Sequence, residues 1–201
     1  MIVDPNTFIL FLLVFTVTLI IPGPNVVFCV AQSLEHGFSG ALPAAFGFAL
    51  GTACHALIVF SGIGIITANL DMLLEFVRWC GISYLLYLAY KSFQLTNMSS
   101  EASVQVAGFA RLVTGAMLVS FTNPKGVAAS LLIYTVFLSP EHSFLPQAVA
   151  MGVCAVMISF VTYGGYILMA SWARFLFTKR AALGKLVGCV YLTVIGALLL
   201  L

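Results

Sequence analysis

Charged residues are scarce in this 201-residue sequence: eight Lys or Arg and six Asp or Glu make up 7% of the chain, whereas 62% of it is hydrophobic. Soluble domains carry about 25% charged residues, so this composition excludes an ordinary water-soluble fold. No Asp, Glu, Lys or Arg occurs between Asp4 and Glu35, between Glu35 and Asp71, or between His142 and Arg174. Stretches of that length can cross a hydrocarbon core about 30 Å thick, so the sequence predicts an integral membrane protein surrounded by a lipid bilayer.

Other absences exclude whole classes of function. The chain has no GxxxxGK[ST] motif, so we expect no unaided nucleotide hydrolysis, and any uphill transport must use a gradient. Its net charge of +2 is too small to indicate a nucleic-acid partner. The five cysteines form no CxxC pair and no short cluster with histidine. We therefore expect no enzyme activity, no catalytic residue, no cofactor and no bound metal.

The apolar runs predict six transmembrane helices. The first apolar segment contains no Lys or Arg, so we interpret it as a retained span and not as a signal peptide. A long polar linker, 96–110, separates a first three-helix repeat, 1–95, from a second, 111–201. Because each repeat has an odd number of spans, the second inserts upside down relative to the first. The predicted fold is an all-α membrane protein of two inverted repeats in one domain, with spans at 6–30, 41–66, 72–93, 112–138, 146–171 and 184–201.

Basic residues gather on one side of the six predicted spans. The loops and span ends on the other side hold only Arg78. Lys and Arg are enriched in cytoplasmic loops, so both termini are predicted to lie outside the cell. The basic residues on the cytoplasmic side are Lys91, Arg111, Arg174, Lys179, Arg180 and Lys185.

Proline motifs interrupt the first and fourth predicted helices, "IPGPN" at 21–25 and "NPK" at 123–125. Proline has no N–H, so the carbonyls of Thr18, Ile20 and Ser120 lose their helical partners. In lipid each unpaired backbone group costs several kcal/mol. Such breaks persist only where protein or water surrounds them, so we expect both to face a cavity.

Each motif also predicts the start of a new half-helix. Gly23 or Asn123 stands at the cap, and Pro24 or Pro124 stands at the first helical position. The N–H groups that follow would point into the cavity, and helix N-termini attract anions such as the carboxylate of an amino acid. The predicted substrate-binding residues are Gly23, Pro24, Asn25, Val26, Asn123, Pro124, Lys125 and Gly126.

Lys125 lies thirteen residues from either end of its predicted span, roughly 20 Å along the helix, which is too far for its ammonium to reach the interface. It either caps carbonyls left free by its own break, or contacts a substrate carboxylate or changes charge during transport. Asn25 and Asn123 can each donate and accept hydrogen bonds, which suits a backbone patch or a zwitterionic ligand. The sequence leaves these roles open.

Spans two and five supply two further candidates. His55 is either a hydrogen-bonded structural residue or a proton-coupling group. Gly47 and Gly51 precede it at the spacing of a small-xxx-small face, which is typical of close helix packing. Tyr163, in the polar segment "SFVTYGGY", is a candidate for a cavity wall or for proton coupling, and a flexible packing site explains that segment equally well.

Four segments resemble the LysE/RhtB family of amino-acid exporters: "IPGPN" at 21–25, "HGFSGAL" at 36–42, "YLLYLAYK" at 84–91 and "FARLVTGAMLVSFTNPKG" at 109–126. The resemblance covers nearly the whole chain. It implies export of amino acids or close derivatives from the bacterial cytoplasm, driven by protons, through the inner membrane. It also implies that the residues of the two proline motifs are the central elements.

Three functions follow from these observations. The first is a proton-coupled exporter of a small zwitterionic amino acid, neutral or similar to homoserine or threonine. The second is a divalent metal exporter, which needs converging carboxylates, His or Cys, whereas the break motifs offer the cation of Lys125. The third is a thiol-disulfide electron carrier, which needs a cysteine beside each break, and the fourth span has none. The amino acid, the stoichiometry of coupling and the existence of a homo-oligomer stay open.

Overall fold

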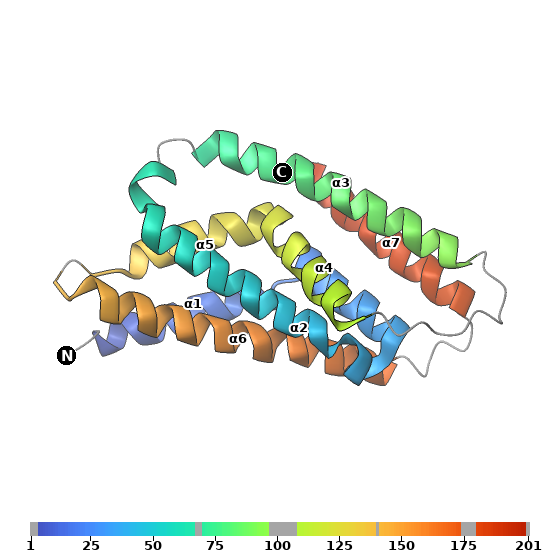
Figure 1. The fold of residues 1–201 in the computed structure, drawn as a ribbon, viewed down its shortest axis with the longest axis horizontal. Helices are drawn as coiled ribbons and strands as arrows, with labels where there is room; N and C mark the ends of the chain where they lie inside the picture. Colours follow the sequence, from blue (N-terminus) through green and yellow to red (C-terminus); the bar gives the residue numbers. More distant parts are fainter. Residues whose placement is uncertain (1–3, 67–69, 97–107, 140, 174–179, 200–201) are drawn as a thin grey trace.

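The computed structural model describes residues 4–66, 70–96, 108–139, 141–173 and 180–199. Every regular element within them is an α-helix, which confirms the predicted all-α fold (Figure 1). Most of the predicted linker 96–110 lies outside the described residues, as do Arg174 and Lys179. The helices are α1 (Pro5–Ile20), α2 (Pro24–Ile66), α3 (Leu70–Thr96), α4 (Phe109–Thr122), α5 (Pro124–Phe137), α6 (Phe144–Ala173) and α7 (Arg180–Leu199).

Several of these helices suit a membrane. Within the described residues, Pro24–Gly62 and Phe144–Ala173 are each long and apolar enough to cross a bilayer. The pair α4 and α5, bent by 69° at the break between them, makes a third candidate span. These candidate spans support a protein that crosses the membrane more than once, while the number of six spans stays a prediction.

The observed connection between the first two predicted spans is shorter than the loop that we expected from the sequence. We expected helices to end at 30 and to resume at 41, but the chain is helical on both sides of Gly37. This residue has φ 74° and ψ −177°, a conformation that glycine adopts without a steric penalty. α2 therefore consists of two helices, 24–36 and 38–66, joined at a one-residue kink.

Helices at corresponding places in the two halves run in opposite directions (Figure 1). α1 and the first part of α2 run one way along the long axis, and α4 with α5 runs the other way. The second part of α2 is opposed to α6 in the same sense, and α3 is opposed to α7. α3 and α7 pack against each other, whereas α2 packs against α6 and α4. Both helix breaks lie near the middle of the molecule.

Gly47 and Gly51 allow α2 and α4 to pack closely. A Cβ atom at Gly47 would lie 2.5 Å from the carbonyl oxygen of Val113, and one at Gly51 would lie 2.7 Å from Oγ of Ser120. Real side chains do not approach so closely, so the interpretation of these glycines as a packing face is confirmed. Their contact joins the first half of the chain to the second.

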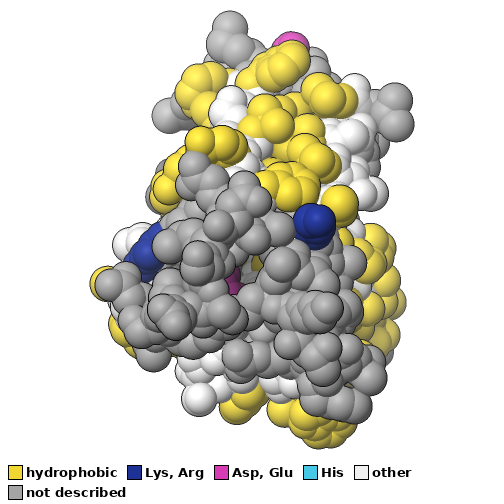
Figure 2. All heavy atoms as spheres, turned by 90° about the vertical axis from the view of Figure 1, so that its right-hand side faces the viewer, with side chains coloured by type: hydrophobic (Ala, Val, Ile, Leu, Met, Phe, Trp, Pro, Cys, Tyr) yellow, Lys and Arg dark blue, Asp and Glu magenta, His cyan; other side chains and the backbone are white. Residues whose placement is uncertain are grey.

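Basic side chains occupy the end of the molecule where α4 and α7 begin. Arg111 and Lys185 are exposed there. Figure 2 looks at this end and shows Lys and Arg side chains beside residues that the structure does not describe. The side chains of Lys91 and Arg180 lie outside the described part.

Candidate functional site

The first break separates α1 from α2. α1 ends at Ile20, Ile21 is extended at φ −63° and ψ 121°, and α2 begins at Pro24 as the sequence predicts. Two carbonyls at the break are hydrogen-bonded by distant side chains. Tyr166 donates its hydroxyl to the carbonyl of Ile20 at 2.5 Å, and Lys125 donates Nζ to that of Ile21 at 2.7 Å. The break is therefore stabilised from outside its own helix.

The second break occurs at a single residue. α4 ends at Thr122, Asn123 is extended at φ −88° and ψ 103°, and α5 begins at Pro124. Asn123 stands at the N-cap of α5, but its side chain makes no capping hydrogen bond. The amide points elsewhere, so the first N–H groups of α5 are left for another acceptor.

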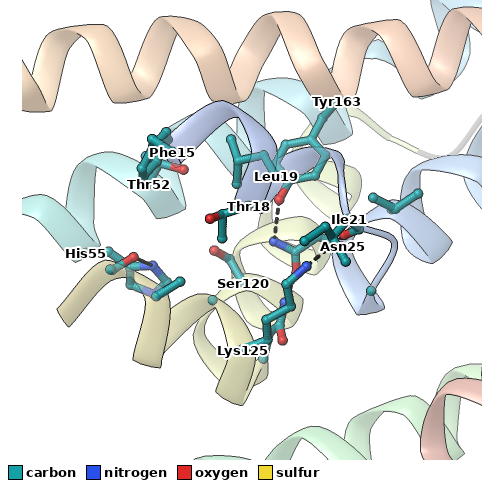
Figure 3. Close-up of a pocket in the computed structure, with 16 residues that line it drawn as sticks. Phe15, Thr18, Leu19, Ile21, Asn25, Thr52, His55, Ser120, Lys125 and Tyr163 are labelled. Atoms are coloured by element: carbon teal, nitrogen blue, oxygen red, sulfur yellow. Dashed lines mark hydrogen bonds between the residues drawn. The ribbon is translucent and has the colours of Figure 1, made fainter. Parts of the chain in front are cut away.

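A hydrogen-bonded series of three side chains connects the two breaks. Asn123 donates Nδ2 to Oδ1 of Asn25 at 2.9 Å. Asn25 donates its own Nδ2 to the hydroxyl of Tyr163 at 2.9 Å (Figure 3). All three side chains are buried, with exposed fractions of 4%, 8% and 3%. Buried amides with hydrogen-bond partners have fixed positions, so these three hydrogen-bonded side chains hold α2, α5 and α6 in register. The remaining oxygen of Asn123, Oδ1, is buried and has no partner among the described residues.

Lys125 contacts the other break and not its own. Its stem passes Gly23, where an added Cβ atom would lie 3.8 Å from Cδ of the lysine, and its ammonium reaches the carbonyl of Ile21. The alternative that it caps carbonyls of the second break is therefore wrong in that form. An ammonium has three donors, and the carbonyl of Ile21 uses one of them.

A cavity of about 40 Å³ lies where the breaks meet (Figure 3). Eight of the ten predicted site residues line it, from both motifs and from spans two and five. The exceptions are Pro24 and Pro124, which begin α2 and α5 but do not line the cavity. The predicted residues that line it are Gly23, Asn25, Val26, Asn123, Lys125, Gly126, His55 and Tyr163.

Sequence reasoning missed the rest of the wall. A mostly apolar side comes from α1, and hydroxyl side chains come from α1, α2, α4 and α5. A hydroxyl at a helical position within a turn of a predicted site residue is a usable signal: Thr52 lies three residues before His55, and Ser120 three before Asn123. The missed residues are Phe15, Thr18, Leu19, Ile21, Thr52, Ser120, Ala129 and Ser130.

His55 stands in the wall with one ring nitrogen unused. Nδ1 lies 3.4 Å from Oγ of Ser130, and the ring meets Phe121 edge to face at 5.1 Å between centroids. Nε2 is buried without a partner in the described part of the chain. Of the polar segment in predicted span five, Tyr163 lines the cavity. Ser159 does not line it but accepts a hydrogen bond from Thr52 at 3.0 Å.

The sequence profile of the LysE type translocator family matches residues 16–201. The chain belongs to this family. The resemblance seen in the two proline motifs is thereby confirmed, and the protein is a LysE family membrane efflux transporter and not an enzyme.

Other LysE-like proteins include efflux proteins with named substrates. The homoserine/homoserine lactone efflux protein of Salmonella typhimurium is 27% identical over 196 residues, 94% of this chain and 93% of that protein. The leucine efflux protein of Salmonella choleraesuis is 32% identical over 110 residues, 54% of this chain and 52% of that one. An uncharacterized membrane protein of Vibrio cholerae is 26% identical over 169 residues, 84% and 82% of the two chains. No solved structure matches the chain.

The residues that line the cavity support neither the divalent metal exporter nor the thiol-disulfide electron carrier. No group of three His, Cys, Asp or Glu side chains that could hold a metal ion occurs within the described ranges. Cys29 is buried in an apolar cluster and does not line the cavity, and the five cysteines are free. The ionisable side chains in the wall are Lys125, His55 and Tyr163.

Proposed function

We propose that this transporter exports neutral amino acids, or close derivatives of the homoserine or threonine type, across the inner membrane of a bacterium. One observation carries the proposal: the N-terminal ends of two interrupted helices and one lysine meet at a single cavity in the middle of the fold. The names of the homoserine and leucine efflux relatives support the same class of substrate.

The proposed architecture is two inverted repeats, 1–95 and 111–201, with six spans. The opposite directions of corresponding helices support it, as does the break at the first helix of each half (Figure 1). The end that carries Arg111 and Lys185 faces the cytoplasm, since basic residues are retained there, and both termini lie outside.

The carboxylate of the substrate binds to Lys125 and to the N-terminus of α5. Residues of the first turns of α2 and α5 line the cavity, and their N–H groups have no acceptor one turn earlier in the same helix. Such N–H groups, together with the positive end of the helix dipole, bind anions. The ammonium of Lys125 adds a full positive charge to this site. When a substrate carboxylate binds to it, the ammonium gives up its hydrogen bond to the carbonyl of Ile21.

The α-ammonium of the substrate binds to the free amide oxygen of Asn123. That oxygen is buried without a partner among the described residues, and an unpaired buried acceptor costs about 1–3 kcal/mol. A substrate that donates to it recovers this free energy. One cavity thus offers donors for a carboxylate and an acceptor for an ammonium, which is the pattern of a zwitterion.

The cavity must widen before it can hold an amino acid. At about 40 Å³ it has room for roughly three water molecules. The hydrogen bond from Lys125 to the carbonyl of Ile21 joins the two breaks, and a substrate carboxylate can displace it because an ammonium binds a charged acceptor more strongly than a neutral carbonyl. Binding therefore loosens the link between the halves, as alternating access requires.

A proton gradient drives the export. The chain lacks a nucleotide-hydrolysis motif, and the ionisable residues of the cavity wall supply groups that can exchange a proton.

Transport by purified protein in liposomes tests the proposal. We expect labelled homoserine and leucine to move down their gradients, and an imposed proton gradient to drive accumulation that a protonophore stops. Movement of neither amino acid would contradict the substrate class, and accumulation that continues after the gradient collapses would contradict proton coupling. In cells, efflux after feeding with defined dipeptides gives an independent ranking of amino acids.

A further inference from the structure

His55 and Asn123 both line the cavity, and each has one buried polar atom without a partner in the described part of the chain. The exposed fraction of His55 is 8% and that of Asn123 is 4%. Nε2 of the histidine and Oδ1 of the asparagine both lack a partner among the described residues. Buried polar groups are nearly always hydrogen-bonded, so two unpaired atoms at one cavity point to a ligand that pairs with both.

The two atoms belong to different parts of the wall. Figure 3 shows His55 on one side of the cavity and Asn25 and Lys125 on the other, with Thr18 and Ser120 between them in this view. A substrate whose carboxylate is held by Lys125 therefore extends its side chain toward His55. The wall on that side carries the hydroxyls of Ser130 and Thr52.

We propose that His55, positioned by Ser130, recognises a hydroxyl at the tip of the substrate side chain and so favours homoserine-like substrates over apolar ones. The proposal rests on the proposed function, since it assumes that an amino acid enters this cavity.

A hydroxyl is the group that fits Nε2 best. If Ser130 donates to Nδ1, then Nε2 carries the proton and is a donor; if Nδ1 donates to Ser130, then Nε2 is an acceptor. A hydroxyl both donates and accepts, so it pairs with Nε2 in either tautomer. An aliphatic side chain leaves Nε2 buried and unpaired, and sites built for a hydrogen bond reject such analogues.

The size of the cavity favours a short side chain. Phe15 and Leu19 form the apolar part of the wall, and the volume is about 40 Å³ before any widening. A hydroxyl two carbons from the α-carbon reaches a distant polar atom with little added bulk.

Homoserine and norvaline test this inference, because their side chains have the same shape and differ in a terminal hydroxyl or methyl group. Liposomes with the intact protein are assayed for downhill movement of each amino acid. We expect the wild type to prefer homoserine, and His55→Leu to lower the homoserine-to-norvaline ratio about tenfold, the value of one hydrogen bond with an unpaired partner. His55→Gln keeps part of the preference, since an amide also donates and accepts, and Ser130→Ala lowers the ratio less than His55→Leu.

A second histidine provides the control. His142 also has a buried ring nitrogen without a described partner, at Nδ1, but it lies in the segment between α5 and α6 and not in the cavity wall. We expect His142→Leu to leave the ratio unchanged. If His55→Leu does not fold, the ratio in His55→Gln and Ser130→Ala decides.

The outcomes separate the two proposals. A wild type that moves neither amino acid overturns the proposed function. A wild type that moves both, with the same ratio in the folded His55 variants, overturns the role of His55 alone. If the His55 variants lose proton-driven accumulation but keep the wild-type ratio of homoserine to norvaline, the role of His55 in recognition is also overturned, and His55 is a coupling residue instead.

Discussion

The break between α1 and α2 extends over three residues and exposes carbonyls, whereas the break between α4 and α5 is one residue long and supplies donors. Ile20 and Ile21 accept hydrogen bonds from Tyr166 and Lys125 at the first break. At the second, Asn123 donates its amide to Asn25. The second half of the chain thus provides the groups that satisfy the first.

This difference shows that two inverted halves can share a backbone design without sharing their chemistry. A second lysine at the first break would face Lys125 across a small cavity, and like charges at short range repel. With the cation on one half and the carbonyls on the other, the breaks attract each other and still leave donors for a ligand.

Lys125→Ala removes the cation of the second break, and we expect it to have the largest effect on transport. Lys125 is half-buried, and a hydrogen bond to a charged group contributes about 1.5–3 kcal/mol, so transport of homoserine in liposomes should fall about 10- to 100-fold. A single symmetric peak in gel filtration would show that the variant still folds. Lys185→Ala, at an exposed position in α7, is the control. Full transport by Lys125→Ala would remove the lysine from the mechanism.

Asn25→Ala breaks the chain of side chains that joins the breaks. It leaves the amide of Asn123 and the hydroxyl of Tyr163 without their buried partner, so we expect a loss of roughly 2–4 kcal/mol in the free energy of unfolding. Tyr163→Phe loses one bond of the chain and should cost about 1 kcal/mol. Thermal unfolding in detergent compares the two variants, and equal effects would contradict this count of lost hydrogen bonds.

Gly47→Ala tests whether α4, which leads into the second break, is held against α2. The new methyl group would meet the backbone oxygen of Val113 at 2.5 Å, and overpacking of this kind costs about 1–3 kcal/mol. Gly164→Ala is the matched control, since a Cβ atom at that position meets nothing within 4 Å. A thermal midpoint unchanged by Gly47→Ala would contradict the close contact.

The smallest expected effect concerns the starts of the two broken helices. Asp4 caps α1 by accepting from N–H and Oγ1 of Thr7 at 2.8 and 2.6 Å, whereas α4 begins at Gly108 without a side-chain cap. Gly108→Asp should therefore stabilise the protein by only a few tenths of a kcal/mol, about the advantage of a polar cap over glycine. An equal or lower thermal midpoint would contradict this.

The cap of α1 also predicts a pH dependence. The hydrogen bonds from Thr7 lower the pKa of Asp4 below its ordinary value of 3.8. A lowered pKa contributes stability above the unfolded value that is lost as the pH falls through the folded one. Below about pH 4 the wild type should lose slightly more stability than Asp4→Asn, whose cap carries no charge, and parallel pH profiles would contradict the prediction.

The positions of the breaks could be predicted from the sequence because proline acts locally. Pro24 and Pro124 lack the N–H that a continuous helix needs whatever surrounds them, and α2 and α5 begin at these residues. The loop at Gly37 was predicted too long, because a single glycine at positive φ can turn a chain that stays helical on both sides.

The partners of polar side chains could not be predicted in this way. In α5 the hydroxyl of Thr135 bonds to the carbonyl of Leu131 in its own helix, while that of Ser130 faces His55 of α2. Nothing in the local sequence separates these cases, since either hydroxyl can bond back to its own helix. The distant packing of another helix decides between them.

By itself the sequence determined that the chain is an apolar helical membrane protein and that two of its helices break at proline, and it predicted one lysine deep within a span. These properties follow from the backbone chemistry of proline and the cost of burying charge, which act over a few residues. Only the tertiary structure decided that Lys125 bonds to Ile21, 104 residues away, and that His55 and Asn123, which line one cavity, each have a polar atom with no partner among the described residues. Those contacts depend on how the described helices pack, and side chains brought together from distant helices have no signature in the chain between them.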